Sequence, residues 1–278
     1  MIISLDCGIS NIDVVAGDEN GVIYQGWTLP SPGTIEPTLL TTVLDASGRY
    51  ADSVHRFVVT GGRSRWLPAE VAGRPVQVVD EILAIGRGGV VLGQLDEALV
   101  VSAGSGTALV AAHGRQFHHV GGSAVGGGTL LGLSQLLLQT SDPAEIERLA
   151  QAGVSAGVDL TIGEVIGGEV GILPVDATAV NFGRAARPGP PPARADIAAG
   201  LTTLVAQTVG ILACISARGL GLDQIVILGH MTDMPSIVAM LQAVGHLYGR
   251  SVIIPPSAGL GVAIGALHEA LDLPDPRG

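Results

Sequence analysis

Two glycine-rich turns lie close together in the middle of the sequence, within residues 101–134. The first turn, at 104–107, follows the apolar, strand-like run 98–101, and the second, at 121–129, precedes the helix-like run 130–138. Glycine lets backbone N–H groups approach an anion closely, and the N-terminus of a following helix adds a favourable dipole. The pair therefore predicts a polyphosphate held between two walls, with simple tight turns in a glycine-rich protein as the plainer interpretation.

The rest of the chain alternates between strand-like and helix-like patterns. Three short strands, predicted at 1–5, 12–16 and 22–27, form an antiparallel meander. Further strands are predicted at 56–59, 76–79, 98–101, 108–112, 116–120, 225–228 and 251–254, and helices at 35–44, 81–95, 129–138, 143–152, 195–217, 233–244 and 259–270. A meander followed by strands and helices, and then a second such unit, predicts a duplicated mixed α/β fold. Ligands of such folds bind in a cleft at the strand ends.

Length and charge limit the possible functions. The chain has 278 residues, enough for two lobes, which we expect at 1–96 and 97–278. Its net charge of −11 argues against nucleic acid or an anionic membrane surface as a partner. All of its fixed positive charges are arginines, because the sequence contains no lysine. This matters because many phosphate-binding enzymes use a lysine as a point charge.

Cysteine usage and hydropathy bear on the compartment. Cys7 and Cys214 form no paired motif, so we expect neither a disulfide nor a zinc site, and a cytoplasmic location. The uncharged segment 197–217 is long enough to span a bilayer. Because glycine, threonine and glutamine interrupt it, we interpret it as a helix buried in a dimer or between lobes rather than in a membrane.

Several short motifs follow one another in a fixed order along nearly the whole chain. They are Asp6-x-Gly8, Thr60-Gly61-Gly62, Glu81 at the head of a helix, AGSGTAL at 103–109, VGGSAVGGGTLLGLS at 120–134, VDL at 158–160, AVNFG at 179–183, ILG at 227–229 and VAIGAL at 262–267. Their succession resembles the type II pantothenate kinases, which belong to the superfamily of acetate kinase, sugar kinases and actin. The resemblance implies an α/β fold made of two ribonuclease H-like lobes with a central nucleotide cleft.

The resemblance also implies an activity and a set of partners. The activity is ATP-dependent phosphorylation of pantothenate or a related primary alcohol, in coenzyme A biosynthesis, with ATP and Mg²⁺ as cofactors. Acyl-CoA is a further possible ligand, and the chain is expected to form a homodimer through the long helix in its second lobe.

Site residues follow from the same resemblance. Asp6 matches the catalytic carboxylate that organises the metal, and Glu81 matches the catalytic base, which also contacts the substrate. The nucleotide-binding residues implied are Gly8, Ser10, Gly104, Ser105, Gly106, Thr107, Gly126, Gly127, Gly128, Thr129 and Gly229. The remaining substrate-binding residues implied are His119, Gly121, Gly122 and Asn181.

Each of these assignments has a structural alternative. For Asp6 the less favoured alternative is a turn carboxylate bonded to nearby backbone, whereas Gly229 is equally explained as a strand-to-helix turn. Apolar neighbours such as Val79 and Ile82 would desolvate Glu81, which raises its pKa and makes it a better base. The alternative for Glu81 is a glutamate favoured by the helix dipole.

Two departures from the family pattern count against a simple kinase assignment. The family's first turn reads DxGxTxxK, whereas this chain ends that turn with Asp13, which exchanges a positive charge for a negative one. In a closed site this reversal weakens ATP binding. The family's substrate arginine is replaced by His119, which either donates a hydrogen bond or is an ordinary strand histidine.

These departures support an alternative function. The chain would then be a catalytically degenerate homologue that binds nucleotide, acyl-CoA or a protein partner as a regulator. A third possibility within the superfamily is an ATPase activator of radical dehydratases. Those proteins hold an iron–sulfur cluster with cysteines in a glycine-rich segment, and neither Cys7 nor Cys214 fits that pattern.

Overall fold

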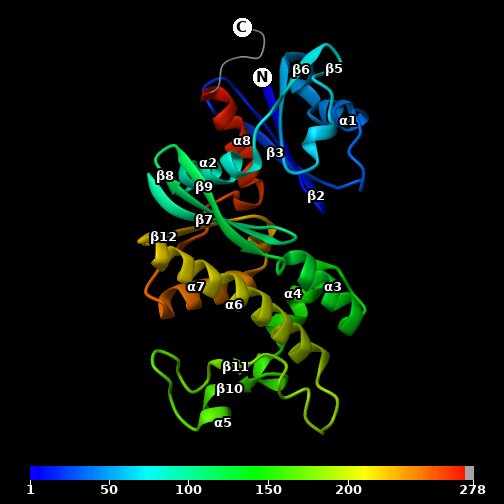
Figure 1. The fold of residues 1–278 in the computed structure, drawn as a ribbon. Helices are drawn as coiled ribbons and strands as arrows, with labels where there is room; N and C mark the ends of the chain where they lie inside the picture. The colour runs from blue at the N-terminus through cyan, green and yellow to red at the C-terminus, as the bar shows by residue number, and fades with distance from the viewer. Residues whose placement is uncertain (273–278) are drawn as a thin grey trace.

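The computed structural model describes residues 1–272, which contain two large β-sheets (Figure 1). In the first sheet the strand order is β3-β2-β1-β4-β6-β5. Its strands are β1 (Ile2–Cys7), β2 (Asn11–Gly17), β3 (Ile23–Pro30), β4 (Arg56–Thr60), β5 (Glu70–Val71) and β6 (Arg74–Val78). The central strands β1 and β4 are almost wholly buried, which explains their continuous apolar runs.

The second sheet repeats the topology of the first. Its order is β13-β12-β7-β8-β9, and its strands are β7 (Glu97–Ala103), β8 (Thr107–His113), β9 (Gln116–Ser123), β12 (Gln224–Leu228) and β13 (Ser251–Ile253). In each sheet an antiparallel meander comes first, and its first strand then pairs in parallel with a later strand: β1 with β4, and β7 with β12. This repeat confirms the predicted duplicated ribonuclease H-like fold.

Two helices lie between the sheets and connect the two halves (Figure 1). They are α2 (Glu81–Gly93) and α8 (Gly261–Asp272), which pack against each other. The early helix α2 packs against β7, β8, β9 and β12 of the second sheet, whereas the late helix α8 packs against β1, β2 and β4 of the first. Each half of the chain therefore contributes a helix to the other half's sheet, and the division at residue 96 remains a prediction.

The other helices cover the outer faces or extend the second lobe. They are α1 (Thr38–Ala46), α3 (Gly127–Leu138), α4 (Pro143–Ala152), α5 (Ile162–Ile166), α6 (Arg194–Leu220) and α7 (Pro235–Leu247). By length and composition α6 is apolar enough to cross a membrane, but 67% of its most apolar window is buried inside the protein. Packing against α3, α4, α7 and the second sheet accounts for that apolar sequence.

Proline explains where two helices differ from their predicted limits. The helix predicted at 35–44 begins at Thr38, because Pro37 occupies its N-cap rather than its interior. The helix predicted at 233–244 begins at Pro235, after the short 3₁₀ turn η4 (His230–Asp233). The short hairpin of β10 (Leu160–Thr161) and β11 (Thr178–Val180) was not predicted, because strands of two and three residues carry no readable alternation.

Candidate active site

Polar residues of four neighbouring strands form one row across the first sheet. Strand register places Thr28 of β3 beside Asp13, Asp13 beside Asp6, and Asp6 beside Thr60 of β4. The chain after β4 then turns at Gly61, which has φ +88°, and a Cβ there would lie 2.8 Å from Asp6 Oδ1. The Thr60-Gly61-Gly62 motif therefore brings its loop directly against the Asp6 carboxylate, where a side chain would not fit.

Asp6, Asp13 and Thr28 of this row line a cavity of about 1240 Å³ between the two lobes. Eleven of the residues predicted to bind or act on ligands line it: Asp6, Gly8, Ser10, Glu81, Gly104, Ser105, Gly106, Thr107, Gly127, Gly128 and Gly229. The cavity thus joins predicted residues from both halves of the chain. Six others are not among its lining residues: Gly126, Thr129, His119, Gly121, Gly122 and Asn181.

The two glycine-rich turns of residues 101–134 pack on each other and build one wall of the cavity. The Gly127 N–H donates to the Gly104 carbonyl at 2.8 Å, and the Gly128 N–H donates to the Ser105 carbonyl at 2.9 Å. A Cβ on Gly126 would lie 2.8 Å from the Gly106 backbone, so this contact requires glycine. Carbonyl groups of the first turn therefore already satisfy two N-terminal amides of α3, and residues of both turns line the cavity.

The opposite wall is the turn between β1 and β2. The hydroxyl of Ser10 in that turn lies 2.8 Å from the hydroxyl of Ser105, so a hydrogen bond joins the lobes at this point. Both serines line the cavity. The two glycine turns therefore form one wall rather than the two predicted, and the β1–β2 turn faces them across the cavity.

Asp13, which stands where the family has a lysine, is paired with a histidine from the other lobe. His230 Nε2 lies 2.7 Å from Asp13 Oδ1, and the same oxygen accepts a 2.7 Å hydrogen bond from the Thr28 hydroxyl. His230 Nδ1 lies 2.6 Å from Asp233 Oδ2. Hydrogen bonding to Asp13 is the main reason that the pKa of His230 rises to about 9, burial opposes it, and Asp233 contributes further. His230 is therefore an imidazolium at neutral pH.

None of the sequence motifs includes His230. His230 follows Gly229, where the chain turns sharply toward the cavity at the end of β12. Gly229 has a φ of +100°, and a Cβ there would lie 2.4 Å from the Ala103 carbonyl oxygen. A histidine directly after the ILG motif was the available signal. Its partner, however, is 217 residues away in the sequence.

Asp6 occupies the centre of the row and has an unusual protonation equilibrium. Burial, followed by the nearby carboxylates of Asp13 and Glu81, raises the pKa of Asp6 to about 7, and His230 acts in the opposite direction. Within residues 1–272, no hydrogen bond holds the Asp6 carboxylate. Its oxygens are therefore free for an incoming ligand, and carboxylate oxygens of this kind suit Mg²⁺.

Glu81 is the first residue of α2 and points into the same cavity. Asp80 caps the helix by accepting hydrogen bonds from the N–H groups of Ile82 at 2.8 Å and Leu83 at 3.4 Å. Burial raises the pKa of Glu81, Asp80 raises it further, and the Gly62 N–H lowers it. Glu81 is nevertheless an exposed residue that lines the cavity, so its carboxylate is less enclosed by apolar neighbours than the sequence predicted.

The far end of the cavity is apolar and lies in the second lobe. Leu130 and Leu131 of α3 and Met231 and Met234 of the η4 region line it, and the α4 residues Ala144, Glu147, Arg148 and Gln151 border it. Glu147 accepts hydrogen bonds from the Ser236 N–H at 3.0 Å and the Ser236 hydroxyl at 2.9 Å, and so caps α7.

His119 and Asn181 lie apart from this cavity. His119 is exposed on β9, the edge strand of the second sheet. Asn181 follows β11 in the extension at the far end of the second lobe (Figure 1). There the buried Asp159 of the VDL motif accepts a 2.8 Å hydrogen bond from the Phe182 N–H and a 3.2 Å bond from Thr178. Within this chain the VDL and NFG motifs hold the extension together.

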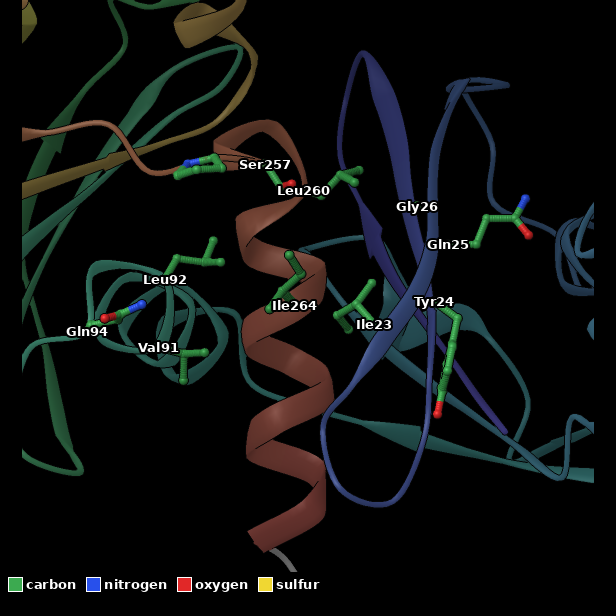
Figure 2. Close-up of a pocket in the computed structure, with 11 residues that line it drawn as sticks. Ile23, Tyr24, Gln25, Gly26, Val91, Leu92, Gln94, Ser257, Leu260 and Ile264 are labelled. Atoms are coloured by element: carbon green, nitrogen blue, oxygen red, sulfur yellow. The ribbon is translucent and has the colours of Figure 1, made fainter.

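A second hollow, of about 570 Å³, lies between β3, α2 and α8 (Figure 2). Apolar side chains dominate its lining, among them Ile23, Leu92, Leu260 and Ile264. Its lining contains no carboxylate, histidine, lysine or arginine. It therefore has no counterpart of the carboxylates and histidine that line the larger cavity, which is the candidate active site.

Comparison with solved structures identifies the fold of this protein. The activator of 2-hydroxyisocaproyl-CoA dehydratase from Clostridium difficile, solved with bound ADPNP, matches with a TM-score of 0.66 at 18% identity, covering 98% of this chain and 94% of that one. A ROK family glucokinase from Streptomyces griseus, solved with glucose and AMPPNP, matches with a TM-score of 0.60 at 13% identity, covering 96% and 98%. The fold is that of the sugar kinases and actin-like ATPases.

Sequence comparison defines the family. The chain belongs to the Fumble family, whose match spans residues 97–248, more than half of its length. A type II pantothenate kinase from Bacillus cereus is 24% identical over 226 residues, covering 79% of this chain and 83% of that protein. A 4'-phosphopantetheine phosphatase from Mus musculus is 30% identical over 187 residues, covering 64% of this chain but only 23% of that protein. Family membership, as a type II pantothenate kinase-like protein, confirms the resemblance.

Proposed function

We propose that the protein is an ATP-dependent kinase that phosphorylates pantothenate or a related primary alcohol in coenzyme A biosynthesis. The observation that carries this proposal is the meeting of Asp6 and Glu81 in one cavity with the Ser10 and Ser105 turns. Phosphoryl transfer needs a base for the alcohol, a cradle for the phosphates and neutralisation of charge, and this cavity offers a residue for each role.

The chemistry would proceed with Glu81 as the general base. Its carboxylate accepts the proton of the acceptor hydroxyl, whose oxygen forms a bond to the terminal phosphorus of ATP as the bond to the bridging oxygen of ADP breaks. The raised pKa of Glu81 makes its carboxylate a stronger proton acceptor than an ordinary glutamate. The Ser10 and Ser105 hydroxyls and the backbone of residues 104–107 would hold the phosphates between the lobes.

Asp6 would hold Mg²⁺ together with the phosphates of the nucleotide. The free oxygens of Asp6, with Asp13 beside it in the strand register, fit this role, because Mg²⁺ is usually bound by one or two carboxylates plus phosphate oxygens. The metal would supply charge neutralisation at the phosphates. The apolar end at Leu130, Leu131, Met231 and Met234 would take the adenine base.

Replacing the base tests the kinase proposal. Glu81→Gln is expected to lower kcat for ADP formation by at least about 100-fold with pantothenate, because an amide cannot accept the proton. Nucleotide affinity should change little. Glu70→Gln, which removes an exposed carboxylate on β5, is the matched control and should retain activity. Equal turnover by the wild type and Glu81→Gln would contradict the role of the base.

A second function is favoured by one observation. Asp13 and His230 occupy the region where the family lysine would reach the phosphates, and both histidine nitrogens already contact carboxylates. On this basis the protein would be a regulator that binds nucleotide, acyl-CoA or a protein partner without turnover. Nucleotide-dependent stabilisation without ADP formation, across pantothenate, pantetheine and hydroxy acids, would support this alternative.

Assembly and location complete the proposal. We place the protein in the cytoplasm, which suits the free thiols of Cys7 and Cys214. Both thiols are buried in hydrophobic clusters rather than in a glycine-rich surface segment. We also propose a homodimer, because apolar side chains of the second lobe are exposed.

A further inference from the structure

One arginine of the cavity, Arg63, belongs to none of the sequence motifs and has no role in the proposed mechanism. Arg63 follows the Gly61–Gly62 turn and lines the central cavity. The loop is held firmly, because the Ser64 hydroxyl and the Ser64 N–H both donate to the Gly61 carbonyl, at 2.8 Å and 3.0 Å. The Arg63 backbone therefore starts beside Asp6, on the β4 side of the polar row.

The Arg63 side chain crosses the end of the sheet toward the β1–β2 turn. Its Nη1 donates a 3.3 Å hydrogen bond to the Ser31 hydroxyl, and the Ser31 N–H in turn donates to the Ser10 carbonyl at 2.9 Å. On its other side, the Cβ position of Gly62 lies 3.8 Å from Glu81 Oε2. The Arg63 side chain thus extends from the loop at Gly62, near Glu81, to Ser31, which is hydrogen-bonded to the turn that carries Ser10.

The charges of the cavity leave this guanidinium without an anion. Five carboxylates line the cavity, from Asp6, Asp13, Glu81, Glu147 and Asp233, against the cations Arg63, Arg148 and His230. His230 is paired with two carboxylates, and Arg148 lies on α4 at the apolar end. No carboxylate among residues 1–272 lies within 4.0 Å of the Arg63 guanidinium. A half-buried arginine with one long hydrogen bond has donors left for a ligand.

We propose that Arg63 binds the terminal phosphoryl group of the nucleoside triphosphate and stabilises the charge that this group carries during transfer. The inference rests on the proposed kinase function. In this chain, a cation from the β4 loop supplies the positive charge that a lysine at position 13 would have provided from β2. Arginine suits the role because its planar fork of N–H donors matches phosphoryl oxygens.

Nucleotide binding tests this role independently of turnover. Isothermal titration calorimetry with ADP and with AMPPNP, both in the presence of Mg²⁺, gives two dissociation constants. Their ratio measures how much the terminal phosphoryl group contributes to affinity. Arg63→Gln should weaken AMPPNP binding by about 10- to 100-fold and change ADP binding by less than about threefold. Arg63→Lys should retain part of the preference for AMPPNP, because it keeps the charge and loses the fork.

The kinetic arm separates Arg63 from a merely structural residue. With pantothenate, Arg63→Gln should lower kcat by about 100- to 1000-fold while KM for pantothenate stays within about threefold. Arg218→Gln makes the same charge change in an exposed part of α6, and should leave both nucleotide affinities and turnover unchanged. Melting temperatures of the variants confirm that each is folded.

Three outcomes would overturn the proposal. One is an equal loss of affinity for ADP and AMPPNP in Arg63→Gln, and another is no loss for either while the wild type still turns over. The third is a rise in KM for pantothenate but not for its neutral alcohol analogue panthenol, with AMPPNP binding intact, which would assign Arg63 to the acceptor's carboxylate. A wild type that binds neither nucleotide and forms no ADP would overturn the kinase function as well.

Discussion

The side chains of Asp13 and His230 meet at 2.7 Å although they belong to different lobes. Asp13 is almost buried and His230 is about one-third exposed, with side-chain exposures of 10% and 30%. An isolated carboxylate at this depth would be costly, and the imidazolium offsets that cost. The substitution that looked damaging in the sequence is therefore one half of a matched pair, and this pair links the lobes beside the proposed phosphate site.

The pair predicts a pH-dependent stability. The folded pKa of His230 is about 9, above its ordinary value of 6.5. Its stabilising contribution is therefore complete below pH 6.5 and is lost as the pH rises through 9. We expect His230→Gln to lower the free energy of unfolding by about 1–3 kcal/mol at pH 6, and by much less at pH 10. Urea unfolding of both proteins at several pH values measures the difference.

The matched control is His118→Gln, which changes an exposed histidine on β9. This variant should differ from the wild type by a small amount at every pH. If the loss caused by His230→Gln were the same at pH 6 and pH 10, the charge of His230 would not contribute to folding.

At the scale of elements, the contact between α2 and α8 positions the two sheets relative to each other. A Cβ on Gly265 of α8 would lie 1.9 Å from the Ala84 carbonyl and 2.4 Å from the Gly88 nitrogen. A Cβ on Gly88 would lie 2.2 Å from the Gly261 carbonyl. These contacts are with backbone atoms, which cannot rotate away as a side chain can. The VAIGAL motif therefore serves close packing of two helices.

Gly265→Ala should be strongly destabilising for this reason. The helices must separate to accept the methyl group, and we expect a loss of about 1–3 kcal/mol in the free energy of unfolding, measured with urea. The control is Gly132→Ala in α3, where nothing lies within 4 Å of the added Cβ. There the change should stabilise the protein by up to about 1 kcal/mol, because alanine favours helix. Equal effects at both positions would contradict the packing argument.

At the scale of the whole molecule, exposed apolar side chains gather in the extension of the second lobe. Ile166 and Ile172 are 59% and 58% exposed, and Val165, Val175 and Val180 of the same extension are each more than 40% exposed. In contrast, α6, the helix predicted to form a dimer interface, is largely buried within its own chain. A second copy of this chain, covering the extension, is the partner we propose.

Sedimentation equilibrium at micromolar concentration should therefore detect a homodimer. Ile172→Glu should shift the population toward monomer, because a charge in an apolar interface must be desolvated. Val22→Glu, at a position of the first lobe that is 50% exposed against 58% for Ile172, serves as the control and should remain dimeric. A wild type that is monomeric throughout the concentration range would contradict the proposal.

Much of the fold was predictable because it depends on local signals. The limits of α4 follow from Asp142 as N-cap and Pro143 at its first position, and the structure has the helix at the predicted residues. The strands of both meanders lie within a few residues of their predicted positions. The hairpin of β10 and β11 could not be predicted, because hydrogen bonds to Asp159, rather than a strand pattern, hold its residues.

The candidate site was predictable in its chemistry and only partly in its geometry. The motifs indicated Asp6, Glu81 and the turn at 104–107, and all of them line one cavity. Arg63 carried no signal of its own, because its position beside the cavity depends on how β4 is placed next to β1. The resemblance to the family predicted His119 at the site. The structure has His119 on the edge strand β9, and it is not among the residues that line the cavity.

The sequence by itself determined the class of fold, the family and the residue types available for phosphate chemistry. Hydrophobic periodicity, turns and caps act over about ten residues or fewer, so they can be read without knowing what packs against them. Only the tertiary structure decided which charges meet. The Asp13–His230 pair, the Ser10–Ser105 contact and the crossing of α2 and α8 join segments far apart in the chain. Their partners are chosen by the packing of two sheets around a shared pair of helices, which no local pattern encodes.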